Sequence, residues 1–88
     1  MKYQVNIKKS CLKAISKLSK KDKEILAHLI SDLGESGPVQ SGYKNYSKLG
    51  NFTYHCHLSY HWVACWQCRN GEFFIEVYYV GSRESAPY

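Results

Sequence analysis

Three histidines in the second half of the chain are the side chains best suited to acid–base chemistry. His55 and His57 alternate with the bulkier residues of the run 54–58. Because successive strand residues point to opposite faces, both imidazoles are expected on the polar face of a sheet. The run 60–66 has its bulky residues at even positions, which places His61 on that same face. Imidazole titrates near ~6.5, so we expect this cluster to supply a general acid and base or to stack on bases.

Zinc binding is the competing chemistry, because these histidines and three cysteines of the same region are ligand types that zinc prefers. The spacing argues against one shared ion. Cys65 and Cys68 are three positions apart on an expected strand, so their side chains point to opposite faces. We expect no metal site and no cofactor. Cys56 is interpreted as a buried structural residue.

The charge of the chain favours a polyanionic partner. Twelve Lys and Arg against seven Asp and Glu give a formal net charge of +5, and such an excess favours nucleic acid. Five lysines concentrate between residues 13 and 23. They could contact phosphates without any chemistry, so a plain RNA- or DNA-binding module remains an alternative.

Length and composition predict a single domain covering residues 1–88. With 88 residues and 44% hydrophobic residues, the chain has enough for one core. Its N-terminus does not resemble a signal peptide, and no apolar run approaches the ~20 residues that cross a bilayer. The four cysteines are therefore expected as reduced thiols. We expect a cytoplasmic protein without a membrane partner.

The first half of the chain predicts a strand followed by two helices. Residues 3–7 alternate between apolar and polar, as in a strand with one buried face. Apolar residues at helical spacing predict a short helix over 10–18, capped by Ser10. Ser19 and Asp22 form a capping box for a second helix, which Gly34 is placed to end. The two helices are expected to form a hairpin.

The second half predicts a loop and then three antiparallel strands. Residues 37–48 lack periodicity, whereas aromatic and β-branched residues dominate from Asn51 onward. The turns are expected near 58–60 and at Arg69-Asn70-Gly71. In the last strand the odd positions 73–79 form the more apolar face and the even positions 74–80 the other. The order predicts an α+β domain, with the N-terminal strand and helix hairpin on one face of a small antiparallel sheet and the other face open.

Several segments together resemble the RelE/ParE superfamily, the toxins of type II toxin–antitoxin systems. They are the strand-helix-helix-strand order, Lys48-Leu49 before the sheet, the run 54–58 and the C-terminal run 75–88. The C-terminal run is the most specific of them. The resemblance implies the RelE/ParE-like α+β fold and a cognate antitoxin as partner.

The resemblance also implies site residues. RelE-type toxins carry a Lys-x-Lys pair, an Arg on the next strand, a late Arg and a C-terminal Tyr. In this sequence those positions hold His55 and His57, then His61, then Arg83 and Tyr88. The last two match in kind, and histidines replace the first three. Histidines also serve in relatives such as the YafQ-type toxins, which makes the change a substitution of acid–base chemistry.

The implied reaction is metal-free cleavage of mRNA in the ribosomal A site, in which a ribose 2′-hydroxyl attacks the adjacent phosphate. His55 or His57 would be the base, Arg83 the phosphate clamp, and His61 or Tyr88 the acid or a stacking platform. Without the resemblance, a surface salt bridge explains Arg83 equally well.

Further RNA contacts are expected from Lys44, Lys48 and Arg69, with the ribosome and mRNA as partners. The main alternative within the superfamily is a ParE-like toxin that poisons DNA gyrase by binding alone.

Overall fold

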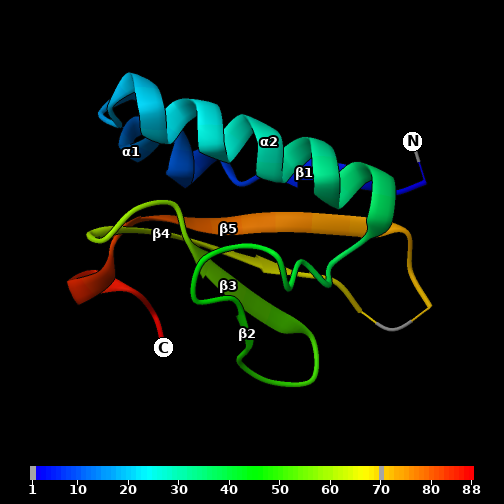
Figure 1. Cartoon of the computed structure of the whole chain (residues 1–88). Helices are drawn as coiled ribbons and strands as arrows, with labels where there is room; N and C mark the ends of the chain where they lie inside the picture. The colour runs from blue at the N-terminus through cyan, green and yellow to red at the C-terminus, as the bar shows by residue number, and fades with distance from the viewer. Residues whose placement is uncertain (1, 70) are drawn as a thin grey trace.

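The computed structural model describes residues 2–69 and 71–88, which form a five-stranded sheet with helices on one face (Figure 1). The elements in chain order are β1 (Gln4–Ile7), η1 (Lys9–Cys11), α1 (Leu12–Ser16), α2 (Lys20–Ser36), β2 (Ser47–Lys48), β3 (Thr53–His57), β4 (Trp62–Gln67), β5 (Phe74–Ser82) and η2 (Arg83–Ser85). The strands lie side by side in the order β1-β5-β4-β3-β2. This arrangement confirms the predicted α+β class.

The sheet is mixed and not wholly antiparallel, because β1 pairs in parallel with β5. Val5 lies opposite Ile75, while β2, β3, β4 and β5 pair antiparallel in sequence order. The prediction placed this strand with the helix hairpin on one face of an antiparallel sheet, whereas it is an edge strand of the sheet and pairs in parallel. Alternation identifies the buried face of a strand but not its neighbour, so the sequence pattern could not place β1.

The second helix begins as predicted and ends later. The backbone N–H of Asp22 donates to the Ser19 hydroxyl oxygen at 3.1 Å, which caps the helix. The helix does not end at Gly34. It continues to Ser36, and Gly37 ends it with a φ of 93°. Gly34 is buried, and its carbonyl accepts a backbone N–H of the N-terminal strand segment.

The first helix is shorter than predicted. A single 3-10 turn, η1, precedes α1, which covers only Leu12–Ser16, and neither has a side-chain cap. Ser10 therefore lies inside η1 and does not cap a helix. No helix among the described residues is long and apolar enough to span a membrane.

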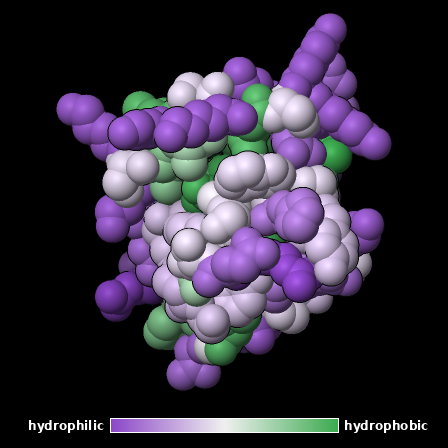
Figure 2. All heavy atoms as spheres, turned by 90° about the vertical axis from the view of Figure 1, so that its left-hand side faces the viewer, coloured by the Kyte–Doolittle hydropathy of each residue, from purple (hydrophilic) through white to green (hydrophobic). Residues whose placement is uncertain are grey.

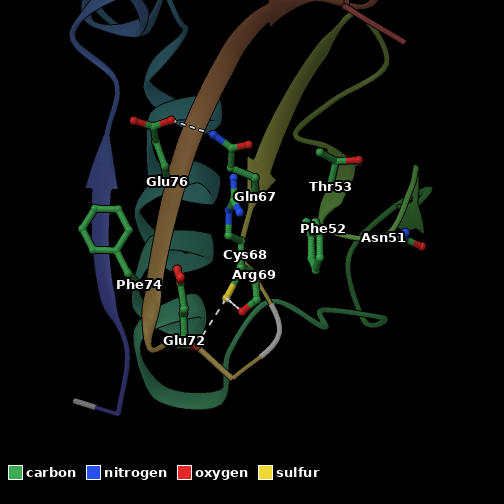
Figure 3. Close-up of a pocket in the computed structure, with 9 residues that line it drawn as sticks. All are labelled: Asn51, Phe52, Thr53, Gln67, Cys68, Arg69, Glu72, Phe74 and Glu76. Carbon is green, nitrogen blue, oxygen red and sulfur yellow. Dashed lines mark hydrogen bonds between the residues drawn. The ribbon is translucent and has the colours of Figure 1, made fainter.

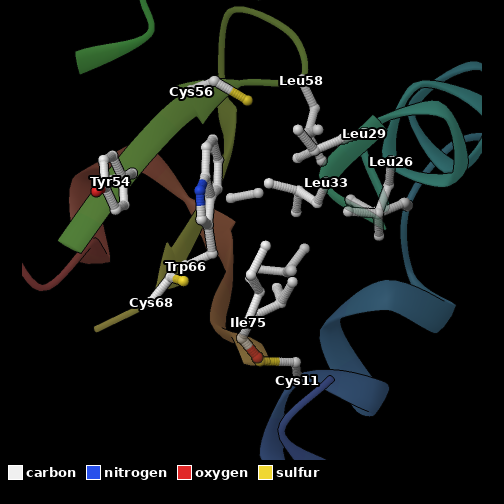
Figure 4. Packing of buried hydrophobic residues seen from close by; sticks show 14 residues of the cluster. Cys11, Leu26, Leu29, Leu33, Tyr54, Cys56, Leu58, Trp66, Cys68 and Ile75 are labelled. Carbon is white, nitrogen blue, oxygen red and sulfur yellow. The ribbon is translucent and has the colours of Figure 1, made fainter. Parts of the chain in front are cut away.

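The core lies between α2 and the near face of the sheet (Figure 4). Trp66 is fully buried, and its indole N–H donates to the Pro38 carbonyl at 2.9 Å. The Tyr54 ring stacks beside it, with centroids 6.2 Å apart. Cys56 is also fully buried on this face, as predicted. Burying such rings supplies much of the stability of a small domain.

A β-bulge in β5 changes which residues face the core. Cys65 pairs with Tyr79 but Trp66 pairs with Val77, so Tyr78 is an extra residue in β5. Val80 therefore joins the core cluster, while Tyr79 shares the opposite face with its partner Cys65. The predicted alternation was wrong beyond Val77 because one inserted residue reverses all later faces.

One connection differs from expectation, and another falls partly outside the described residues. The predicted loop contains β2, whose Ser47 lies opposite His55. The expected turn at 69–71 falls partly outside the described residues, because Asn70 is not among them. On either side of it, the Glu72 N–H donates to the Arg69 carbonyl at 3.1 Å and Gly71 has a φ of 80°.

Candidate functional site

The face of the sheet opposite the helices carries the paired histidines of β3. His55 and His57 both point to this face, where Cys65 and Val63 are their partners on β4. The two imidazole centroids are 5.8 Å apart. His55 Nδ1 lies 3.0 Å from the Ser47 hydroxyl oxygen, which fixes the ring orientation. Sequence reasoning missed Ser47, because the two-residue strand that carries it gives no periodic signal.

This face is not open as expected, because the segment after η2 turns back across it (Figure 1). The Tyr88 ring lies 4.4 Å from the His55 ring, centroid to centroid. His55 is consequently only 7% exposed, and Val63 and Cys65 are fully buried beneath the same layer. The prediction that the histidines are solvent-exposed is wrong for His55, because side-chain alternation says nothing about a segment that folds back later.

Burial changes the proton affinity of His55. Loss of hydration lowers its pKa below 6.5, and the neighbouring His57 lowers it further, while a hydrogen bond at Ser47 acts in the opposite direction. The lowered pKa favours the neutral form of the imidazole, which is the form that can accept a proton. A neutral, oriented imidazole is what a general base requires.

Tyr88 lies in an environment that holds its proton. Burial of the phenol against the sheet raises its pKa, with Cys65 and Tyr79 adding to the rise and the positive charge of Arg83 opposing it. The ring is nevertheless 54% exposed, so one side of it remains accessible. Tyr88 therefore has a phenol with a raised pKa, and its ring lies against the His55 ring.

His61 and Arg83 form a second group at the end of the sheet. His61 precedes β4, in the turn, and its carbonyl accepts the Arg83 backbone N–H at 2.8 Å. The Arg83 guanidinium lies over the Tyr60 ring at 4.6 Å, and the His61 ring meets the same ring edge-on at 4.8 Å. His61 thus contacts Tyr60, whereas the ring contacts of His55 are with His57 and Tyr88. Sequence reasoning missed Tyr60, whose signal was a lone exposed aromatic residue in a turn.

The three expected RNA-binding residues are dispersed. Lys44 lies next to the site, because its carbonyl accepts the His57 backbone N–H at 2.8 Å. Lys48 pairs with Tyr54 and holds its ammonium 5.8 Å from that ring, on the side of the sheet away from His55. Arg69 lies 6.0 Å over the Phe52 ring and lines a separate cavity.

The end of the molecule with the β3–β4 turn and η2 is largely polar. Figure 2 shows hydrophilic and intermediate side chains over most of it, with strongly hydrophobic ones in small patches only. Arg83 and His61 are exposed here. A surface of this kind suits a charged, hydrated ligand better than an apolar one.

The cysteines are poorly suited to metal binding. All four are free and buried, and burial raises the pKa of Cys56 and of Cys65 to about 12. Their thiols therefore keep their protons, whereas zinc binds the thiolate. Within residues 2–69 and 71–88, no group of three or more His, Cys, Asp or Glu is arranged to hold a metal ion.

Comparison with known proteins identifies the fold. No family model matches the chain. No curated protein sequence matches it either. Among solved structures, a chain of the archaeal RelE–RelB complex from Pyrococcus horikoshii superposes with a TM-score of 0.81 at 22% identity, over 98% of this chain and 100% of that one.

Two further structures agree. A mutant of the E. coli toxin RelE, in complex with an antitoxin RelBc peptide, gives a TM-score of 0.74 at 22% identity over 97% of this chain and 87% of that one. The YoeB dimer from Staphylococcus aureus gives a TM-score of 0.73 at 11% identity, over 94% of this chain and 99% of that one. Nearly the whole chain is covered each time, and these comparisons establish that the protein has the RelE toxin fold.

Proposed function

We propose that this protein is the toxin of a type II toxin–antitoxin system and that it cleaves mRNA on the ribosome without a metal ion. One observation carries the proposal. The His55 ring is oriented by Ser47, its pKa is lowered by burial, and it contacts Tyr88 on the helix-free face of a RelE fold. Transesterification of RNA requires a base for the 2′-hydroxyl and a proton donor for the leaving oxygen, and these two neighbouring side chains can supply both.

The reaction follows from these groups. His55 removes the proton of a ribose 2′-hydroxyl, whose oxygen forms a bond to the adjacent phosphorus. The bond from phosphorus to the 5′-oxygen breaks, and Tyr88 gives that oxygen its proton. The products are a 2′,3′-cyclic phosphate and a 5′-hydroxyl. The Arg83 guanidinium, charged at every working pH, stabilises the extra negative charge on the five-coordinate phosphorus.

Substrate access requires movement of the segment after η2. Tyr88 covers His55, whose exposed fraction is only 7%. The 3-10 turn η2, from which the segment leaves, contains no buried residue. RNA would displace the Tyr88 ring by a short distance, and the base on one side of the scissile bond would replace it against the imidazole.

An antitoxin is the proposed protein partner. Two of the similar structures are complexes of RelE with RelB or with a RelB-derived peptide. The net charge of +5 favours an acidic partner segment as well as RNA. Both ligands would compete for the same basic molecule, which gives neutralisation a simple physical basis.

The decisive experiment is cleavage of a reporter mRNA in a reconstituted translation system. We expect cuts within the reading frame that appear only when ribosomes are present, and that map to 2′,3′-cyclic phosphate ends. The double variant His55→Ala/Arg83→Ala is the matched inactive protein. Translation that stops while the mRNA stays intact would sink the nuclease proposal, and double-strand DNA breaks in expressing cells would support gyrase poisoning instead.

A further inference from the structure

A cavity of about 440 Å³ lies on the helix-free face, beyond the residues used above (Figure 3). It is formed where the loop before β3, the end of β4 and the start of β5 come together. Its lining residues are Asn51, Phe52, Thr53, Gln67, Cys68, Arg69, Glu72, Phe74 and Glu76. A volume of this size fits a nucleobase.

The cavity is adjacent to His55 on the same face. Thr53, which lines the cavity, lies two residues before His55 on β3. Its partner on β4 is Gln67, just as the partner of His55 is Cys65. Strand residues two apart point to one face and are separated by about 7 Å. A base attached to a nucleotide beside the cleaved phosphate therefore reaches this cavity.

Aromatic rings flank the cavity on two sides. Phe52 comes from the loop before β3 and Phe74 from β5, and Figure 3 shows them on opposite sides of Gln67 and Arg69. Their side chains are 37% and 41% exposed, which is unusual for phenylalanine. The Arg69 guanidinium lies 6.0 Å from the Phe52 ring. Exposed aromatic rings and planar guanidinium groups are the surfaces on which single-stranded bases stack.

Between the rings, the polar groups are mainly acceptors. Gln67 Nε2 donates to Glu76 Oε1 at 2.8 Å, which orients the amide and leaves its carbonyl oxygen and Glu76 Oε2 available. Glu72 contributes a second carboxylate to the lining. These negative charges repel phosphate, so an RNA strand would present a base edge to them. Arg69 is the one cation among the lining residues, all of which the structure describes.

We infer that this cavity binds a guanine base of the RNA, and the inference rests on the proposed function. Guanine has N–H donors on two adjacent atoms, N1 and N2, which a carboxylate such as that of Glu76 accepts as a pair. Its O6 is an acceptor that arginine recognises, and Arg69 is in place. Adenine, cytosine and uracil lack this combination of two adjacent donors and an acceptor.

The test is direct binding of short single-stranded RNA whose 2′-hydroxyls are methylated, so that no cleavage occurs. The probes carry guanine, inosine or adenine at one position, and affinity is measured by NMR titration. We expect guanine to bind about tenfold more tightly than adenine. Inosine, which lacks the N2 amine, should be intermediate. Equal affinity for guanine and adenine would overturn the inference.

Two variants assign the preference to the cavity. Glu76→Gln retains the size of the side chain and should reduce the preference for guanine to less than about twofold. Glu24→Gln on α2 removes the same charge from the other side of the molecule and should leave the preference unchanged. Phe52→Leu should weaken binding of all three probes similarly. If Glu76→Gln, folded by circular dichroism, keeps the full preference, the cavity is not the site.

The same measurements separate this inference from the proposed function. If the protein prefers guanine in the binding assay but leaves ribosome-bound mRNA intact, the nuclease proposal is refuted and the guanine site is retained. If it cleaves ribosome-bound mRNA but binds all probes equally, the guanine site is refuted and the nuclease proposal is retained.

Discussion

The Tyr88 ring lies against the His55 imidazole, with the centroids 4.4 Å apart and the ring planes inclined by 43°. This contact joins the segment after η2 to the centre of β3, and it excludes water from the imidazole. The position of the segment and the pKa of His55 are therefore linked.

Substitution of Tyr88 separates its two roles. Tyr88→Phe keeps the stacked ring and removes the hydroxyl, so mRNA cleavage should fall by about 10²-fold or more if the hydroxyl is the proton donor. Tyr88→Ala also uncovers His55, and its pKa should rise toward 6.5 because hydration of the imidazolium is restored. NMR titration of the His55 ring protons measures that rise. An unchanged titration in Tyr88→Ala would show that the tyrosine does not control burial of the imidazole.

The cleavage rate should depend on pH through His55. Because burial lowers the pKa of His55, the base stays neutral to a lower pH than an exposed histidine, and the acidic limb of the rate profile should lie below pH 6.5. The single-turnover rate of mRNA cleavage on ribosomes, measured from about pH 5 to about pH 8, locates this limb. A limb centred above 6.5 would exclude His55 as the base.

The same pKa shift affects stability, with a definite sign. Below about pH 6.5 the unfolded chain binds more protons at His55 than the folded chain does. The free energy of unfolding should therefore fall as the pH drops through 6.5 toward the folded-state pKa, and level off below it. Urea unfolding at several pH values should show this loss of stability in the parent protein and not in His55→Asn.

Arg83→Ala should reduce cleavage without unfolding the protein. Loss of a charge-assisted clamp on a transition-state phosphate costs on the order of 2–4 kcal/mol, or roughly thirty- to a thousand-fold in rate. Arg83 is exposed, and its guanidinium lies over the exposed Tyr60 ring at the surface, so the core should persist. Growth inhibition and primer extension report the loss. Lys23→Ala, an exposed charge on α2, serves as control; an equal loss there would indicate a general charge effect.

Gly81→Ala should destabilise the protein through Tyr79. A Cβ at Gly81 would lie 2.7 Å from Tyr79 Oη and 2.9 Å from Cζ, and that hydroxyl is held by a 2.7 Å hydrogen bond to the Ser82 carbonyl. We expect a cost of about 1–2 kcal/mol in urea unfolding. In a Tyr79→Ala background the same change should cost less than about 0.5 kcal/mol. Equal costs in both backgrounds would contradict the packing explanation.

Metal removal should have no effect. The cysteine thiols keep their protons, and the described residues contain no cluster that could hold an ion. Exhaustive chelation should leave the melting temperature unchanged, and cleavage should persist once the ribosomes are supplied with their own magnesium. Stoichiometric zinc in elemental analysis, lost together with the fold on chelation, would reverse the conclusion.

Local signals in the sequence predicted the elements well. The cap at Ser19 and the placement of Cys56 and Trp66 in the core were readable because they depend on neighbours in the chain. Alternation alone predicted that His55 and Cys56 point to opposite faces of the sheet. These features depend on the two- and 3.6-residue periods, which a single sequence displays.

Features that depend on distant partners could not be predicted. The bulge at Tyr78 appears only in the register with β4, and it reversed the faces of Tyr79 and Val80. The cover of Tyr88 over His55, and the role of Ser47 as its orienting partner, need the tertiary fold. The candidate site was therefore proposed from its residue types, while its burial and the pKa shift of His55 needed the structure.

The parallel pairing of β1 with β5 has a consequence for synthesis. The first strand of the chain is completed by the last, since Gln4 pairs with Phe74 and Ile7 with Val77. Until β5 has been synthesised, β1 lacks its strand partner, and such long-range pairing forms slowly because a large loop must close. The sheet that carries the histidines is therefore complete only after β5 has emerged from the ribosome and β1 has found its place beside it.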